Sequence, residues 1–244
     1  MSRVALVTGG SRGIGAATVL RLAQMGYDVA FTYRVEEEKA RALAKKVEEL
    51  GRRAWPIQLN LEELWRIKGV VDEVEKLGSL VVLVNNAGYV QRIAPEDLSL
   101  ADWEKMIRVS LTAPFLFIQA AVPHMKKASF GRIVNVSSLR ALTGSAHGVH
   151  YAAAKAGLLG LTKSYALALA PFGITVNAVC PGFVNTDINK EQLEKHGAEI
   201  LRQIPLGRVA DPAEVAALIA FLCSEEAGYI TGATFSINGG LRMD

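Results

Sequence analysis

The chain has 244 residues, half of them apolar, and a formal net charge of +3 at pH 7. This length can bury one large core, and the small, dispersed charge argues against a nucleic-acid or membrane partner. Cys180 and Cys223 lie in apolar runs, which predicts buried thiols and a reducing, cytoplasmic location. We expect neither a signal peptide ahead of the first strand nor an apolar run long enough to cross a bilayer.

Short β-branched runs alternate with helical patterns along the whole chain. Strands are predicted at residues 4–7, 29–32, 54–59, 80–84, 133–136, 174–179 and 234–237, and helices at 14–25, 36–50, 62–76, 101–127, 151–170 and 212–222. This alternation implies a parallel sheet covered by helices on both faces, with right-handed crossovers. We predict an α/β fold with a doubly wound parallel sheet of the Rossmann type, and residues 1–244 as a single domain.

A glycine-rich loop joins the first strand to the first helix. Glycines there let the backbone approach a pyrophosphate, and the helix N-terminus supplies N–H donors. In an open parallel sheet the ligand lies beyond the carboxyl ends of the strands, so the loops that follow the other strands should face it too. The predicted cofactor contacts are Gly9, Ser11, Arg12, Gly13, Ile14, Gly15, Arg34, Asn60, Leu61, Asn86, Ala87, Gly88, Tyr151, Lys155, Pro181, Gly182, Val184 and Thr186. No metal site is predicted.

The end of the second strand indicates which dinucleotide is bound. An acidic residue there would hold the ribose 2′-hydroxyl of NAD, but this strand ends in Tyr33-Arg34, and Asp28 lies at its opposite end. Arg34, together with Arg12, could pair with a phosphate dianion. An ordinary solvated arginine at position 34 is the alternative. The pattern favours NADP(H) over NAD.

Ser138, Tyr151 and Lys155 form the candidate catalytic group. Ser138 follows a strand, while Tyr151 and Lys155 are four residues apart on an alanine-rich helix and share one face. An ammonium beside a phenol favours the phenolate, so we expect the pKa of Tyr151 to fall. The three groups could protonate a carbonyl oxygen while hydride reaches its carbon. A tyrosine and a lysine at this spacing also occur on helices that have no catalytic role.

Taken together, these motifs resemble the short-chain dehydrogenase/reductase family. The resemblance rests on Thr8-Gly9-x-x-x-Gly13-x-Gly15, Asn85-Asn86-Ala87-Gly88, Ser138, Tyr151-x-x-x-Lys155 and Pro181-Gly182, and residues 207–232 resemble its 3-oxoacyl-[acyl-carrier-protein] reductase branch. The family implies a tyrosine acid/base, a lysine that holds the nicotinamide ribose and lowers the tyrosine pKa, and a serine that orients the substrate oxygen. It also implies a homotetramer built on the two long helices.

Three positions depart from the family pattern. The usual catalytic asparagine of the long helix falls at Ser110, and a glycine common after the catalytic serine is Ala141. Where carrier-protein reductases have basic docking residues, this chain has Ser129 and Phe172. Ser110 could hold the water of the family's proton relay from further away, or it could merely bond a preceding carbonyl inside the helix.

Three functions therefore remain open. The first is NADPH-dependent reduction of a 3-oxoacyl thioester, free or carrier-bound, and the second is the same chemistry on a sugar, polyol or small ketone. The third is a weakly catalytic NADP(H)-binding sensor, against which the presence of Ser138, Tyr151 and Lys155 argues. The polar segment 187–204, between the Pro181-Gly182 turn and Pro205, is predicted to form a mobile lid over the substrate.

Overall fold

The computed structural model describes residues 2–243, and in this range seven parallel strands form one sheet. The strand order is β3-β2-β1-β4-β5-β6-β7, so the direction of winding reverses between β1 and β4. The strands are β1 (Arg3–Val7), β2 (Asp28–Tyr33), β3 (Ala54–Gln58), β4 (Ser79–Asn85), β5 (Gly131–Val136), β6 (Ile174–Pro181) and β7 (Thr234–Ile237). The predicted doubly wound α/β sheet is confirmed.

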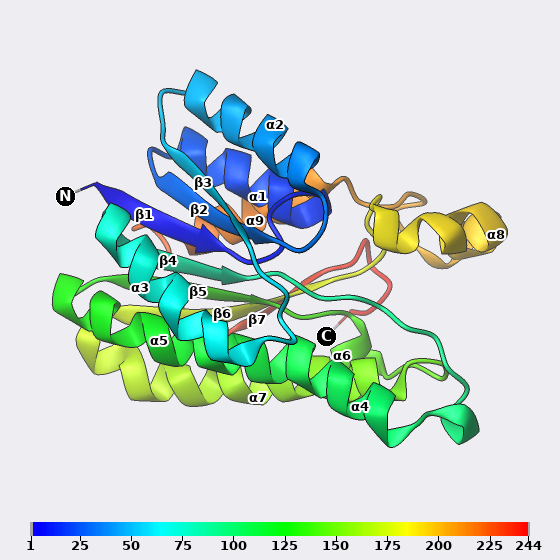
Figure 1. The fold of residues 1–244 in the computed structure, drawn as a ribbon. Coiled ribbons are helices and arrows are strands. Elements are labelled where there is room, and N and C mark those ends of the chain that lie inside the picture. Colours follow the sequence, from blue (N-terminus) through cyan, green and yellow to red (C-terminus); the bar gives the residue numbers. More distant parts are fainter. Residues whose placement is uncertain (1, 244) are drawn as a thin grey trace.

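Helices cover both faces of the sheet (Figure 1). One layer consists of α1 (Gly13–Gln24), α2 (Glu37–Glu49) and α9 (Pro212–Leu222), and the other of α3 (Ile67–Leu77), α5 (Ala113–Ala128) and α7 (Val149–Leu169). Because successive side chains of a strand point to opposite faces, Ala5 and Val7 join the core of the first layer, whereas Val4 and Leu6 join that of the second. Burial on both faces explains why the strands are almost continuously apolar.

The predicted long helix at 101–127 is interrupted. It consists of α4 (Leu100–Ile107), a π-helical segment (Arg108–Thr112) and α5. Pro114 has no N–H, so a regular helix would lack the bond from residue 114 to residue 110, and the backbone widens at this point. The helix predicted at 62–76 likewise becomes regular only at Ile67, after a 3₁₀ turn at Leu64–Arg66.

By length and composition, the continuous helical stretch Leu100–Ala128 could cross a membrane, so the expectation that no apolar run is long enough was wrong. Burial explains much of its composition. Phe117, Ile118, Ala121 and Met125 are fully buried in the core of the second layer. The apolar residues of this stretch therefore include a face that packs against the sheet.

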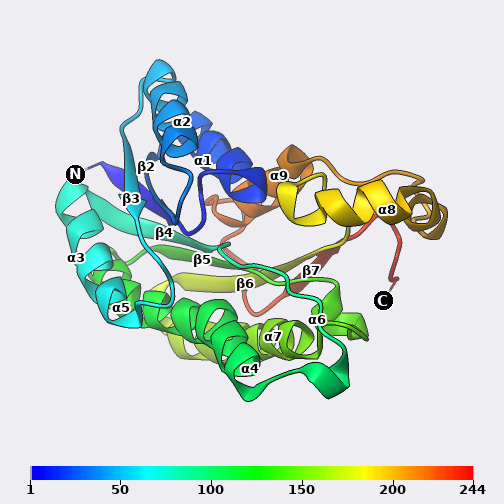
Figure 2. The same ribbon diagram turned by 45° about the vertical axis from the view of Figure 1, so that its right-hand side comes forward.

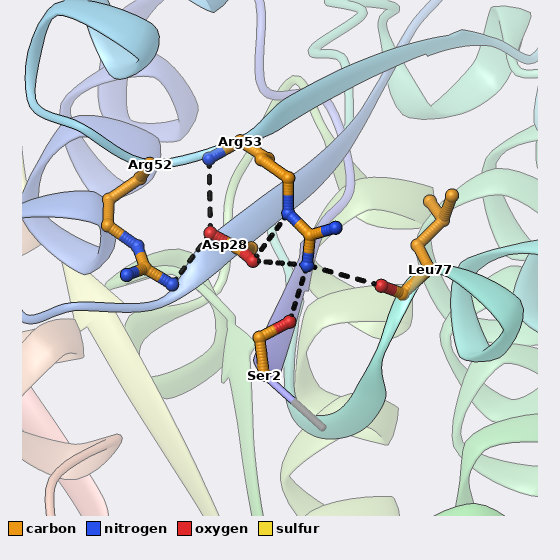
Figure 3. A network of polar contacts seen from close by, with 5 residues as sticks. All are labelled: Ser2, Asp28, Arg52, Arg53 and Leu77. Carbon is orange, nitrogen blue, oxygen red and sulfur yellow. Dashed lines mark hydrogen bonds and ion pairs between the residues drawn. The ribbon is translucent and has the colours of Figure 1, made fainter.

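An ion-pair network joins the elements at the amino edge of the sheet (Figure 3). Asp28 is 2% exposed. Its carboxylate accepts from the backbone N–H of Arg53 at 3.0 Å and from the Arg53 guanidinium at 2.7 Å, and it lies 2.7 Å from the Arg52 guanidinium. Arg53 also donates to the Ser2 hydroxyl and to the Leu77 carbonyl oxygen. Burial alone would raise the pKa of Asp28, but these hydrogen bonds and the charge of Arg52 outweigh it and lower that pKa.

The opposite, carboxyl edge of the sheet carries α8 (Asp187–Gln203), which lies at the right of Figure 1 and Figure 2 and in Figure 1 stands apart from the two helical layers. Its backbone departs from helical geometry at His196, and Ile200 is its buried residue. This edge also holds α6 (Arg140–Thr143), a short helix that is not among those predicted from the sequence.

Candidate active site

A cavity of about 1140 Å³ opens at the carboxyl edge of the sheet, lined by the loops after β1 to β6 and by α8. Its volume exceeds the ~300–1,000 Å³ of ordinary small-molecule sites, so a dinucleotide and a second ligand fit together. The cofactor contacts predicted from the sequence all line it: Gly9, Ser11, Arg12, Gly13, Ile14, Gly15, Arg34, Asn60, Leu61, Asn86, Ala87, Gly88, Tyr151, Lys155, Pro181, Gly182, Val184 and Thr186.

The glycine loop is locked to the loop after β4. The Thr8 hydroxyl accepts from the backbone N–H groups of Asn86 and Ala87, both at 3.0 Å, and the Asn86 amide donates to the carbonyl oxygens of Thr8 and Gly9. A Cβ on Gly9 would lie 2.9 Å from the Ala87 Cα, and one on Gly15 would lie 2.1 Å from the Gly9 carbonyl oxygen. Only glycine fits these two positions, and the cavity floor is bare backbone, as close approach of a pyrophosphate requires.

The end of β2 presents a cation to the cavity. Arg34 is exposed there, and Asp28 lies at the other edge of the sheet, as predicted. Arg12 reaches Asp187 at the start of α8, with 3.2 Å between guanidinium and carboxylate, and Lys39 lies 3.8 Å from the same carboxylate. Arg34 and Arg12, which both line the cavity, fit a dinucleotide that carries a 2′-phosphate.

Asn60 has a local partner in this structure. Its side-chain oxygen accepts from the Glu62 backbone N–H at 3.2 Å, which shapes the turn after β3. The side chain still lines the cavity beside the buried Leu61. The predicted contact with an adenine edge remains a prediction.

Ser138, Tyr151 and Lys155 meet at one end of the cavity. Ser138 follows β5 and is 8% exposed, and its hydroxyl lies close enough to Tyr151 to hydrogen-bond the phenol. Lys155 is 4% exposed; its Nζ lies 5.9 Å from the centre of the Tyr151 ring and donates to the Val136 carbonyl oxygen at 2.8 Å. The Ser137 hydroxyl donates to the Lys155 carbonyl oxygen at 2.8 Å, which fixes α7 against the end of β5.

The pKa of Tyr151 does not fall in this structure, contrary to the prediction. Burial raises it, and hydrogen bonding by Ser138 and the charge of Arg140 only partly oppose that effect. Lys155 does not compensate, because its ammonium points to Val136 and burial lowers its own pKa to about 8. A lysine one helical turn away thus lowers the pKa of a phenol only if its ammonium group is directed at the hydroxyl.

Ser110 lies outside the cavity lining found within residues 2–243. It is fully buried in the π-helical segment, and its hydroxyl donates to the Met106 sulfur at 3.4 Å. It thus bonds the preceding helical turn, although to a side chain and not to a carbonyl. The neighbouring Val109 does line the cavity.

Sequence reasoning missed several polar residues of the cavity wall. Arg140 begins α6, and its backbone N–H donates to the Ser138 hydroxyl at 3.1 Å. Arg92 donates to the Gln192 side chain on α8, and the Ile93 N–H donates to the His147 carbonyl oxygen at 3.0 Å. Arg140 could have been found from its position two residues after Ser138. The sequence carries no comparable signal for Arg92 or His147.

The doubly wound sheet, the glycine loop and the Ser-Tyr-Lys group at one carboxyl-edge cavity define a dinucleotide-dependent oxidoreductase. Comparison with known families agrees: residues 9–242 match a family model described as enoyl-(acyl carrier protein) reductase. The chain belongs to the short-chain dehydrogenase/reductase family.

Named relatives span the full chain. It is 41% identical over 244 residues to the 3-oxoacyl-[acyl-carrier-protein] reductase FabG of Staphylococcus aureus, covering 100% of this chain and 99% of the relative. It is 42% identical over 241 residues to the acetoacetyl-CoA reductase of Rhizobium meliloti, covering 98% of each. A solved blue fluorescent protein from a metagenomic library, in complex with NADPH, has a TM-score of 0.91 and 39% identity over 99% of this chain and 98% of its own.

Proposed function

We propose that the protein is an NADPH-dependent carbonyl reductase that acts on 3-oxoacyl thioesters, with Tyr151 as the proton donor. The observation that carries this proposal is a single cavity with Ser138, Tyr151 and Lys155 at one end and the exposed Arg34 at the other. The relatives named for 3-oxoacyl-carrier-protein and acetoacetyl-CoA reduction, and the neighbour solved with NADPH, support the substrate class and the cofactor.

Ser138, Tyr151 and Lys155 would have different roles in carbonyl reduction. Ser138 donates a hydrogen bond to the substrate carbonyl oxygen and orients it, and Tyr151 transfers its proton to that oxygen. The raised pKa of Tyr151 keeps the phenol protonated and ready to donate. Lys155, whose ammonium is held by the Val136 carbonyl oxygen, binds a ribose hydroxyl of the cofactor. Bound NADPH supplies the hydride.

We also propose that α8 is the substrate lid, corresponding to the segment 187–204 predicted from the sequence. It carries one buried residue, Ile200, and it is tied to the cavity rim by exposed polar contacts from Arg12 to Asp187 and from Arg92 to Gln192. An exposed ion pair such as Arg12–Asp187 contributes only ~0–1 kcal/mol, so opening the lid would break few stabilising contacts.

Exposed apolar and aromatic side chains support the proposal of a homotetramer. Leu167 on α7 is 82% exposed, Tyr229 is fully exposed, and Phe172 and Phe115 are also exposed. A second copy packed against this surface would remove it from water. The cytoplasmic location stays a proposal, supported by the bacterial reductases among the relatives.

Steady-state NADPH oxidation tests the proposed reaction. Acetoacetyl thioesters of coenzyme A and of carrier protein should react, and a panel of sugars, polyols and small ketones measured in parallel tests the alternative substrates. Tyr151→Phe should reduce kcat by at least ~10²-fold, the lower bound for positioned proton transfer, while NADPH binding by fluorescence is retained. Activity within a few-fold of wild type in that variant would contradict the role of Tyr151.

A further inference from the structure

Arg140 places a positive charge inside the catalytic end of the cavity. It lines the cavity, is half-buried, and is held at its backbone by the hydrogen bond from its N–H to the Ser138 hydroxyl. Its charge reaches the phenol of Tyr151, where it lowers the pKa against the larger effect of burial. A substrate whose carbonyl lies between Ser138 and Tyr151 would therefore lie close to this guanidinium.

The acidic residues of the cavity are already engaged with other cations. Glu62 lies 3.2 Å from Lys105, and Glu191 lies 2.7 Å from Lys195. At the far, cofactor end, Asp187 and Glu36 pair with Arg12 and Lys39. Within residues 2–243, Arg140 is left as a cavity guanidinium with no carboxylate within 4.0 Å.

Arg92 provides a second positive charge in the cavity lining. Its guanidinium donates to the neutral Gln192 side chain, and its charge is felt by Glu191, whose own partner is Lys195. The loop that carries it is joined to the α6–α7 loop by the hydrogen bond from the Ile93 N–H to the His147 carbonyl oxygen. The substrate end of the cavity is consequently more basic than a neutral acyl chain requires.

We propose that Arg140 determines specificity by pairing with an anionic group of the substrate, so that ketones bearing a carboxylate or phosphate a few bonds from the carbonyl are preferred to their neutral counterparts. The planar guanidinium matches both groups with two parallel hydrogen bonds. An anionic group at this point would also give the guanidinium the carboxylate or phosphate partner that it lacks within residues 2–243. This inference rests on the proposed carbonyl reduction but not on its thioester substrate, which carries no anionic group close to the ketone.

Pairs of matched substrates test the inference. We would measure kcat/KM with NADPH for acetoacetate against methyl acetoacetate, and for dihydroxyacetone phosphate against dihydroxyacetone. In wild type the anionic member of at least one pair should be preferred, and Arg140→Gln should lower the anionic-to-neutral ratio by roughly 10- to 100-fold, as expected for a lost hydrogen bond between charged groups. The pair in which the ratio changes identifies carboxylate or phosphate as the recognised group.

The ratio separates substrate recognition from effects on Tyr151. Because both members of a pair use the same proton donor, any change in Tyr151 acidity or in folding cancels in the ratio. Arg140→Lys should retain part of the preference. Arg41→Gln, at an exposed arginine of α2 that pairs with Glu37, is the matched control for loss of a guanidinium and should leave the ratio unchanged.

Binding gives a second readout. The carboxylate 3-hydroxybutyrate should perturb the fluorescence of protein-bound NADPH, and Arg140→Gln should weaken this response by a similar factor, whereas the response to methyl 3-hydroxybutyrate should not change. Equal losses for both members of every pair in Arg140→Gln would overturn the inference while leaving carbonyl reduction in place. If no ketone or thioester is reduced at all, the proposed function itself fails.

Discussion

The buried Lys155 gives the sharpest test of the site's energetics. Burial lowers the pKa of its amine from 10.5 to about 8, and the side chain is 4% exposed. Since one pKa unit corresponds to about 1.4 kcal/mol, keeping this lysine charged in the folded protein costs roughly 3 kcal/mol. The fold carries this cost at neutral pH for a residue we assign to catalysis.

The sign of the pH dependence follows from linkage. Below pH 8 the amine is charged in both the folded and the unfolded chain, so the full cost is present. Between about pH 8 and 10.5 the unfolded chain binds more protons, and the stability contributed by this group rises with pH. Above 10.5 the amine is neutral in both states and the cost is gone.

We therefore compare Lys155→Met with wild type by urea unfolding from pH 7 to 10.5, at one protomer concentration. The loss of the hydrogen bond to the Val136 carbonyl oxygen lowers the free energy of unfolding of the variant by an amount that does not change with pH. The stability of wild type relative to the variant should thus increase by roughly 3 kcal/mol across this range. The variant should also have lost reductase activity.

Lys163→Met, at an exposed lysine further along α7, controls for removal of an amine from the same helix. An exposed ammonium stays hydrated after folding, so the stability of this variant should change with pH in parallel with that of wild type. If the curve of Lys155→Met is also parallel to wild type from pH 7 to 10.5, Lys155 is not desolvated as the structure indicates, and the reasoning fails.

Four further outcomes are expected. Arg34→Asp should lower the NADP-to-NAD ratio of kcat/KM by at least ~10-fold, because a carboxylate repels the 2′-phosphate; an unchanged ratio would assign that contact elsewhere. Ser110→Ala should keep kcat within about two-fold at every pH, since the hydroxyl bonds Met106, and a marked loss would restore the proton-relay hypothesis. Hydrogen exchange in residues 187–204 should be fast in the free protein and slowed by NADPH plus substrate, whereas equal protection in both states would indicate a fixed element. Asp28→Asn should lower the free energy of unfolding by ~1–3 kcal/mol at pH 7. Because the pKa of Asp28 is lowered in the folded protein, its carboxylate stabilises the fold above pH ~4 and loses this effect below it. In acid unfolding, the difference in stability between the variant and wild type should therefore close as the pH falls.

Patterns along the chain were sufficient for the sheet and for most of the cavity. Short apolar runs that alternate with helical periods form a parallel sheet with helices on both faces. In such a sheet the carboxyl ends of the strands meet at one edge. This is why Gly9, Asn86, Ser138 and Gly182, far apart in sequence, could be assigned to one cavity from the sequence alone. Lys155 could likewise be placed beside Tyr151, because a helix fixes residues four apart on one face.

The direction of side chains and the balance of charge were decided by the tertiary structure. Helical spacing placed Lys155 near Tyr151 but could not tell that its ammonium would bond Val136, so the predicted pKa shift of Tyr151 had the wrong direction. The isolation of Arg140 likewise depends on four carboxylates from three other segments, each already paired with another cation. Local sequence determines backbone periodicity because its causes act within a few residues, whereas desolvation and ion pairing depend on which distant groups the fold brings within about 4 Å.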